Sequence, residues 1–130
     1  MAIAIAARAD GFTLGIDLEE WGPRPVDIAR RVLVDGELRA IGALPEADRW
    51  QGLMLRFSLK EAVYKALDPF VERYIAFSEA SVEPHEDGSA RIELSLRGAE
   101  GPFALSAAWF VRDGHVVSIV RACRSAPIAL

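Results

Sequence analysis

The sequence predicts an α+β domain in which an antiparallel β-sheet meander packs around one long central helix. The residues between Pro45 and Phe70 carry the longest helical pattern of the chain. Short apolar runs on either side of this segment alternate with Asp-Gly turn signals, as the strands of an antiparallel sheet do. The chain has 130 residues, of which 52% are hydrophobic, which suffices for the core of one compact domain. We therefore expect a single domain over residues 1–124 and a loose C-terminal tail over residues 125–130.

At the N-terminus the pattern predicts a β-hairpin. Residues 2–7 alternate Ala and Ile, Asp10-Gly11 is a turn signal, and residues 12–19 resume a strand pattern. One face of this second strand carries the apolar side chains of Leu14, Ile16 and Leu18. We expect that face to join the core, and Asp17 and Glu19 to project together from the opposite face.

The segment after this strand turns the chain toward its helices. The prolines of Trp21-Gly-Pro-Arg-Pro25 impose an extended connection. A short amphipathic helix is then predicted over residues 26–34, and another helical turn or two over residues 37–43. The long helix begins near Pro45 and ends near Asp68-Pro69. Because apolar residues occupy two of its faces, we expect it to be largely buried.

Four short strands follow the long helix. Pro84-His-Glu-Asp-Gly88 separates the first two, and Arg112-Asp-Gly114 separates the last two. The strands are predicted over residues 77–83, 90–96, 103–111 and 115–121. Consecutive strands joined by such turns pair antiparallel, which gives the meander.

Composition and charge narrow the class of protein. The formal net charge is −4 at pH 7, which argues against nucleic acid as the main partner, because affinity for a phosphate backbone comes from dense Lys and Arg. Cys123 is the only cysteine, so no disulfide forms within the chain, and a reducing compartment is favoured. The first residues lack the basic start of a signal peptide, and no apolar run approaches the roughly 20 residues of a membrane helix. We expect a cytoplasmic protein that does not contact a membrane.

The first group of residues that indicates chemistry is acidic. Asp17 and Glu19 on one strand face make a hard, doubly negative site of oxygen ligands, which is the kind of site that Mg²⁺ accepts. The plainer interpretation is that two acidic residues lie at the solvated end of an edge strand.

The second group lies in the long helix, where Glu61 and Lys65 are four residues apart and share a helix face. One interpretation is a surface ion pair. The other is functional, because the surrounding turns are apolar and a buried charge there needs a partner or a ligand. Glu61 then serves as a third metal ligand or accepts a proton, and Lys60 and Lys65 hold phosphates as point charges.

Together, Gly-Ile-Asp-Leu-Glu19 and Phe-Ser-Leu-Lys-Glu-Ala-Val-Tyr-Lys-Ala66 resemble the signature pair of the 4′-phosphopantetheinyl transferases. With the following Phe-Val-Glu-Arg-Tyr-Ile-Ala-Phe77, the pair is closest to the C-terminal half of the surfactin-type and enterobactin-type enzymes. The resemblance covers roughly residues 2–121. It implies a Mg²⁺-dependent enzyme of polyketide or fatty acid biosynthesis. Such an enzyme transfers the 4′-phosphopantetheine arm of coenzyme A to a serine of an apo acyl, peptidyl or polyketide carrier protein.

The resemblance also implies a role for each matching residue. Asp17, Glu19 and Glu61 are the expected Mg²⁺ ligands. Lys60 and Lys65 are expected to contact the phosphates of coenzyme A. Glu61 is the expected general base, and Lys65 is expected to take part in catalysis beside it.

One departure from the family pattern affects the expected assembly. Surfactin-type enzymes are about twice this length, with two similar halves, and the Ser-His motif that ends their N-terminal half does not occur here. Either the domain self-associates so that its sites form between subunits, as in the trimeric short synthases, or it is half of a longer enzyme or part of a larger synthase. We favour a homotrimer. The alternative functions are a non-catalytic carrier-protein-binding module that lacks half of the coenzyme A pocket, and a Mg²⁺-dependent hydrolase of phosphate esters.

Overall fold

The structure is a computed structural model that describes residues 2, 11–25 and 27–125. The first strand of the predicted N-terminal hairpin and most of the predicted tail lie outside these residues. Within the described part, no helix is long and apolar enough to cross a membrane.

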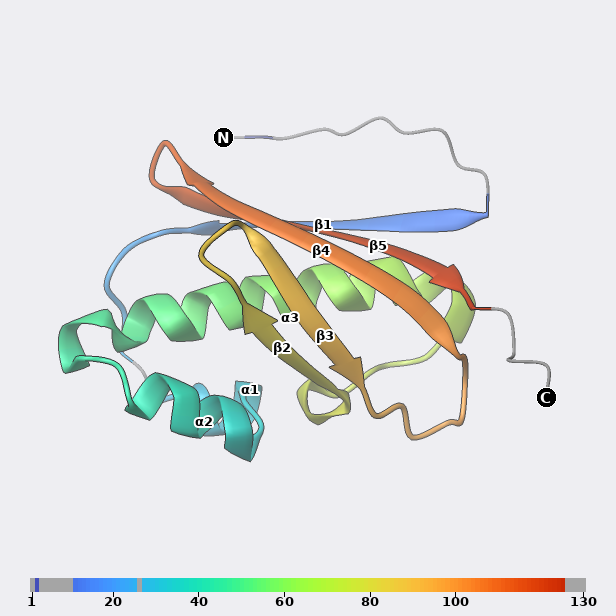
Figure 1. The fold of residues 1–130 in the computed structure, drawn as a ribbon, viewed down its shortest axis with the longest axis horizontal. Helices are drawn as coiled ribbons and strands as arrows, with labels where there is room; N and C mark the ends of the chain where they lie inside the picture. Colours follow the sequence, from blue (N-terminus) through green and yellow to red (C-terminus); the bar gives the residue numbers. More distant parts are fainter. Residues whose placement is uncertain (1, 3–10, 26, 126–130) are drawn as a thin grey trace.

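The fold has two layers, an antiparallel five-stranded sheet and a long helix that lies along one face of it (Figure 1). The strand order is β1-β5-β4-β3-β2. Strands β2 to β5 form the predicted meander, and β1 pairs antiparallel with β5 at the edge of the sheet. The predicted α+β class is therefore confirmed. The strands are β1 (Phe12–Glu20), β2 (Ala80–Pro84), β3 (Ser89–Leu94), β4 (Phe103–Arg112) and β5 (His115–Arg124).

The long helix is α3 (Arg49–Val71), which the 3₁₀ helix η1 (Glu46–Asp48) precedes. It ends at Glu72, whose left-handed backbone (φ 53°) stops the helix in the way that a residue after a helix C-terminus commonly does. Twelve of its residues are buried, so it is the central helix that its two apolar faces predicted.

Two short helices pack beside the N-terminal half of α3 (Figure 1). Helix α1 (Ala29–Val32) is one turn long, which is shorter than predicted, because Leu33 adopts extended backbone and ends it. Helix α2 (Asp35–Gly42) then starts anew, since Glu37 Oε1 accepts a hydrogen bond from Val34 N at 2.9 Å. A further 3₁₀ helix, η2 (Phe77–Glu79), replaces the start of the strand predicted from residue 77.

The face of β1 that packs on α3 is opposite to the predicted one. Gly15 is buried directly against the helix, and a Cβ at this position would overlap the carbonyl oxygen of Ala62. Asp17 shares that face and is 4% exposed. Strand alternation places the half-buried side chains of Leu14, Ile16 and Leu18 on the face away from α3. The reason is steric, because only a residue without a side chain lets the strand and helix backbones approach this closely.

Candidate active site

The predicted acidic residues come together where β1 crosses α3. Thr13 Oγ1 donates a hydrogen bond to Ala66 O at 2.5 Å, and Lys65 Nζ donates to Ile16 O at 3.0 Å. These contacts and the close approach at Gly15 hold the strand on the helix. Asp17 and Glu19 of β1 therefore face Glu61 and Lys65 of α3.

Asp17 is at the centre of this group. Its Oδ1 atom lies 3.0 Å from Lys65 Nζ, and its Oδ2 atom is buried without a hydrogen-bond partner among the described residues. The Lys65 side chain is 52% exposed, so its ammonium group also faces solvent. One interpretation of the sequence is an ion pair between Glu61 and Lys65 on the helix surface. In the structure Lys65 pairs instead with Asp17 of β1.

Two carboxyl groups of the cluster, those of Glu19 and Glu61, have a raised pKa. Burial and the nearby Asp17 carboxylate raise the pKa of Glu19 to about 7, although Arg24 opposes the shift. Burial and Asp17 also raise the pKa of Glu61, against the influence of Lys65. Both shifts mean that the site disfavours the charged carboxylates, first because they are partly buried and second because the Asp17 carboxylate is close. A bound cation would relieve this repulsion.

The donor set fits Mg²⁺ in its chemistry. Asp17, Glu19 and Glu61 offer only carboxylate oxygens, the ligands that this hard cation prefers, and Glu19 lies within hydrogen-bonding reach of Asp17. Across residues 11–25 and 27–125, no three acidic, His or Cys side chains are close enough together to enclose an ion as they stand. The ligand set therefore stays a prediction.

Lys60 does not join the cluster. Its side chain is 0% exposed, and its Nζ atom lies 2.6 Å from Glu37 Oε1. The same atom donates hydrogen bonds to Val32 O at 2.8 Å and Phe77 O at 3.0 Å. An ammonium group has three donors, and all three are used inside the protein. In this structure Lys60 holds α1, α2 and η2 against α3, where the sequence predicts a contact to phosphate.

A cavity of about 230 Å³ lies on the other side of Glu61. Sequence reasoning identified Glu61 but missed the other lining residues, although the helical spacing of Tyr64 and Asp68 from Glu61 places all three on one face. Tyr74 at its rim is 82% exposed. The lining consists of Glu61, Tyr64, Asp68, Arg73, Tyr74, Ile75 and Phe77.

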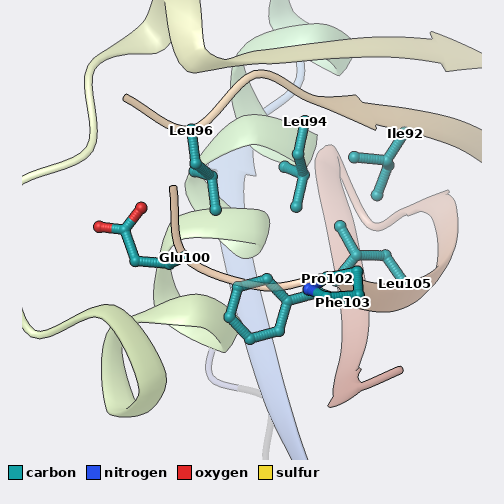
Figure 2. Close-up of a pocket in the computed structure, with 7 residues that line it drawn as sticks. All are labelled: Ile92, Leu94, Leu96, Glu100, Pro102, Phe103 and Leu105. Atoms are coloured by element: carbon teal, nitrogen blue, oxygen red, sulfur yellow. The ribbon is translucent and has the colours of Figure 1, made fainter. Parts of the chain in front are cut away.

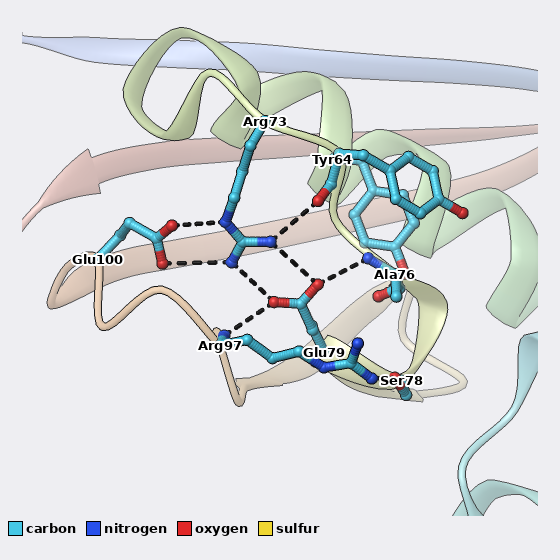
Figure 3. Close-up of polar contacts among 8 residues, drawn as sticks. Tyr64, Arg73, Ala76, Ser78, Glu79, Arg97 and Glu100 are labelled. Atoms are coloured by element: carbon cyan, nitrogen blue, oxygen red, sulfur yellow. Dashed lines mark hydrogen bonds and ion pairs between the residues drawn. The ribbon is translucent and has the colours of Figure 1, made fainter.

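The outer wall of this cavity is fixed by a network of charged hydrogen bonds (Figure 3). Arg73 Nη2 lies 2.7 Å from Glu79 Oε1, and Arg73 Nε lies 2.6 Å from Glu100 Oε1. Glu79 also accepts hydrogen bonds from Ala76 N at 2.7 Å and Arg97 N at 2.8 Å. The hydrogen bonds from Arg73 lower the pKa of Glu79 the most, and together with the two backbone donors they bring it to about 2. The segment between α3 and β2 is therefore held firmly.

A second cavity, of about 300 Å³, lies between β3 and β4 (Figure 2). The two strands pair only at Ser89 with Ala108 and at Ala90 with Ala107, and they then diverge. Its lining is apolar except for Glu100, whose carboxylate is already paired with Arg73. This cavity is separate from the carboxylate cluster and contributes no group to it. Figure 2 shows its side chains, which are Ile92, Leu94, Leu96, Glu100, Pro102, Phe103 and Leu105.

Comparison with known sequences finds one family. Residues 13–120 match the 4′-phosphopantetheinyl transferase superfamily. The chain is 30% identical over 125 residues to the 4′-phosphopantetheinyl transferase Svp of Streptomyces mobaraensis, an alignment that covers 90% of this chain and 50% of that protein. The chain thus spans about half the length of the curated relative that it matches.

Comparison with solved structures finds the same fold in shorter proteins. An ACPS–CoA complex from Chronobacterium ammoniagenes has a TM-score of 0.67 at 19% identity, covering 90% of this chain and 100% of that one. Holo-ACP-synthase from Plasmodium yoelii has a TM-score of 0.70 at 14% identity, with the same coverage of 90% and 100%. At these identities the likeness concerns the fold alone.

Proposed function

Because the chain belongs to the 4′-phosphopantetheinyl transferase superfamily, we propose that it transfers the 4′-phosphopantetheine arm of coenzyme A to a serine of an apo carrier protein. The serine Oγ forms a bond to the phosphorus that carries the arm. The bond from that phosphorus to the bridging pyrophosphate oxygen breaks, and 3′,5′-adenosine bisphosphate leaves. One observation carries the proposal: Asp17, Glu19, Glu61 and Lys65 converge where β1 crosses α3.

We assign the metal ligands to the three carboxylates of this cluster. Asp17, Glu19 and Glu61 would hold Mg²⁺, which neutralises charge on the pyrophosphate and orients it. The raised pKa values of Glu19 and Glu61 support the assignment, because burial and the Asp17 carboxylate disfavour their charged forms and a bound cation would offset both effects.

Glu61 and Lys65 supply the remaining chemistry. Lys65 uses two of its three donors on Ile16 O and Asp17 Oδ1, which leaves one for a phosphate oxygen on its solvent side. Glu61, whose pKa is raised by burial and by the Asp17 carboxylate, accepts the proton of the attacking serine. Phosphoryl transfer depends mainly on positioning and charge neutralisation, and these residues supply both.

The cavity beside Glu61 gives the pantetheine arm a place to lie. It adjoins the carboxylate cluster at Glu61 and is lined by Tyr64, Tyr74 and Phe77. Aromatic walls suit the methyl groups of the arm, and the polar groups at the rim suit its amides.

We further propose that a second copy of the domain completes each site, with a homotrimer as the favoured assembly. The chain spans about half the length of its curated relative, so a second copy would bring the assembly to the length of that protein. The sheet face away from α3 carries an apolar row, since the ladder aligns Leu18 with Val117 and Val117 with Phe110. Phe110 is 40% exposed there.

Light scattering tests this assembly. A particle larger than one domain, reduced to the monomer mass by Phe110→Asp, supports it. A strictly monomeric wild type at high concentration contradicts it.

The second candidate function, a non-catalytic carrier-protein-binding module in the cytoplasm, is favoured by the same half length.

Calorimetry with coenzyme A and Mg²⁺ separates the two functions. The enzyme predicts heat that depends on Mg²⁺ and is lost in Glu61→Ala. A wild-type protein that gives no heat at high concentration, yet binds an apo carrier protein, is the non-catalytic module. Release of inorganic phosphate without a carrier protein would instead support the phosphate-ester hydrolase.

A further inference from the structure

We infer that Ser58 of α3 and Ser118 of β5 are positioning residues that hold the Asp17 carboxylate through an ordered water bound to its Oδ2 atom. The inference rests on the proposed function in one respect: because the site would hold Mg²⁺, these two hydroxyls set its affinity for the metal. It gives a role to Ser58, which lies in the signature stretch without an assigned role, and it adds Ser118.

The first observation is a shortage of hydrogen bonds. Among the described residues, the buried side-chain atoms without a partner are Asp17 Oδ2, Ser58 Oγ, Ser118 Oγ and Arg56 Nε. Both serines are 0% exposed. Buried polar groups in native proteins are nearly always paired, so three oxygens without a partner call for a common explanation.

The sheet places Ser118 beside Asp17. The two residues are directly paired in the β1–β5 ladder, and directly paired residues have side chains on the same face with Cβ atoms about 4.5–5.5 Å apart. That face is the one against α3, because Asp17 and Ser118 are both buried there and Gly15, two residues before Asp17, contacts the helix.

The helix places Ser58 at the same level. Thr13 donates a hydrogen bond to Ala66 O. Gly15, two residues further along β1, lies against Ala62, which is four residues before Ala66 in α3. Two strand residues advance about 6.8 Å and four helix residues about 6.0 Å, so strand and helix stay roughly in step. The next step along both elements sets Asp17 opposite Ser58.

The chemistry of the three groups is complementary. An ionised carboxylate only accepts hydrogen bonds, and each serine hydroxyl has one proton to donate. Asp17 Oδ1 already accepts from Lys65, whereas Oδ2 has free acceptor capacity. The three oxygens do not bond to one another directly, and one ordered water that accepts from Ser58 and Ser118 and donates to Oδ2 satisfies all three. It also fixes the plane of the carboxylate, as hydrogen bonds behind a metal ligand do.

Metal titration tests the consequence. Mg²⁺ affinity is measured by calorimetry on the wild type, Ser58→Ala, Ser118→Ala and Ser118→Cys. We expect each alanine variant to weaken Mg²⁺ binding by about tenfold, and Ser118→Cys to weaken it as well, because a thiol fills the space but donates poorly. Val82→Ala is the control, since it loosens the core on β2 and leaves Mg²⁺ affinity unchanged. Wild-type affinity in both alanine variants, or full rescue by Ser118→Cys, overturns the inference.

A double-mutant cycle without metal tests the contact itself. Urea unfolding is measured for Ser118→Ala, Asp17→Asn and the double variant. We expect their effects on the unfolding equilibrium constant to be coupled by at least about threefold, and additive effects overturn the inference. If the wild type binds no Mg²⁺ while this coupling is present, the proposed metal site fails and the Ser118–Asp17 contact stands.

Discussion

Lys65 Nζ lies 3.0 Å from Asp17 Oδ1, so the ammonium group of α3 pairs with a carboxylate of β1. This contact joins the two sequence stretches that the family resemblance singled out. It also keeps a positive charge beside the buried Asp17, which is 4% exposed. The pair thus supports both the packing of β1 on α3 and the charge balance of the site.

Replacing Lys65 should reduce transfer strongly. Lys65→Ala removes a charged donor beside the pyrophosphate, and loss of one such donor lowers kcat by about 10²–10³-fold in comparable sites. Lys65→Arg, which keeps the charge, should retain more activity. Steady-state kinetics of transfer to an apo carrier protein measures both. Equal activity in wild type and Lys65→Ala would show that Lys65 does not act in catalysis.

Glu61→Ala should abolish transfer and leave the fold intact. Its carboxyl group has a raised pKa because burial and Asp17 disfavour its charged form, so removing it relieves repulsion. Circular dichroism and urea unfolding check the fold, and the carrier-protein assay checks activity. An unfolded Glu61→Ala protein would mean that Glu61 is structural and that its site assignment is wrong.

The elements with strong local signals were predictable from the sequence. Pro45 and Asp68-Pro69 mark the ends of α3 closely, and Arg112-Asp-Gly114 marks the β4–β5 turn. The inward face of β1 was not predictable from alternation alone, because Leu14, Ile16 and Leu18 are the more hydrophobic set. The missed signal was Gly15 together with the small Ala62 and Ala66, which allow two backbones to meet.

The site was predictable in part. The spacing of Asp17, Glu19, Glu61 and Lys65 indicated residues that the fold does bring together. Lys60 could not be assigned from spacing, since its partners Glu37, Val32 and Phe77 lie 17 to 28 residues away along the chain. The cavity beside Glu61 depends on Arg73 and Glu79, whose pairing across a loop leaves no periodic pattern.

Gly15→Ala should destabilise the protein markedly. The added Cβ would overlap backbone atoms of Ala62 and Ala66, which cannot move aside as a flexible side chain could. We expect a loss of about 3 kcal/mol or more in the free energy of unfolding, measured in urea. Gly22→Ala is the matched control, because nothing lies within 4 Å of its added Cβ. Similar stability of the two variants would contradict the close packing of β1 on α3.

Lys60→Met should destabilise the fold far more than the same change at Lys65. Removing the Lys60 ammonium leaves the buried Glu37 carboxylate without its charge partner, which costs about 3–5 kcal/mol in comparable buried pairs. Lys65→Met also removes the partner of a buried carboxylate, Asp17, but Lys65 is half exposed and water can take its place, so the loss should be smaller, about 1–2 kcal/mol. Urea unfolding compares the two variants. A stable but inactive Lys60→Met protein would return Lys60 to the phosphate-binding role that the sequence predicts.

The titration of Glu19 should make both stability and Mg²⁺ binding depend on pH. Its pKa is about 7 in the folded protein against the ordinary value of 4.5, so between these values the folded state binds more protons than the unfolded state. The free energy of unfolding without metal should therefore fall as pH rises from about 5 to about 8. Mg²⁺ competes with the proton, so Mg²⁺ affinity should rise over the same range.

Unfolding in urea and Mg²⁺ calorimetry at pH 5.5 and pH 8 measure these two trends. The free-energy change is on the order of 1 kcal/mol, because solvent screens this partly exposed group. Glu19→Gln should flatten both dependences. If the pH profiles of Glu19→Gln equal those of the wild type, Glu19 is not the group that titrates in this cluster.

The central claim is that the cluster of Asp17, Glu19, Glu61 and Lys65 transfers a phosphopantetheine arm. Mass spectrometry of an apo carrier protein incubated with this protein, coenzyme A and Mg²⁺ tests it most directly. We expect the carrier protein to gain the mass of one 4′-phosphopantetheine group, and to gain none with Glu61→Ala or without Mg²⁺. An unmodified carrier protein at high concentrations of the folded wild-type protein, with several carrier proteins tried, would contradict the claim.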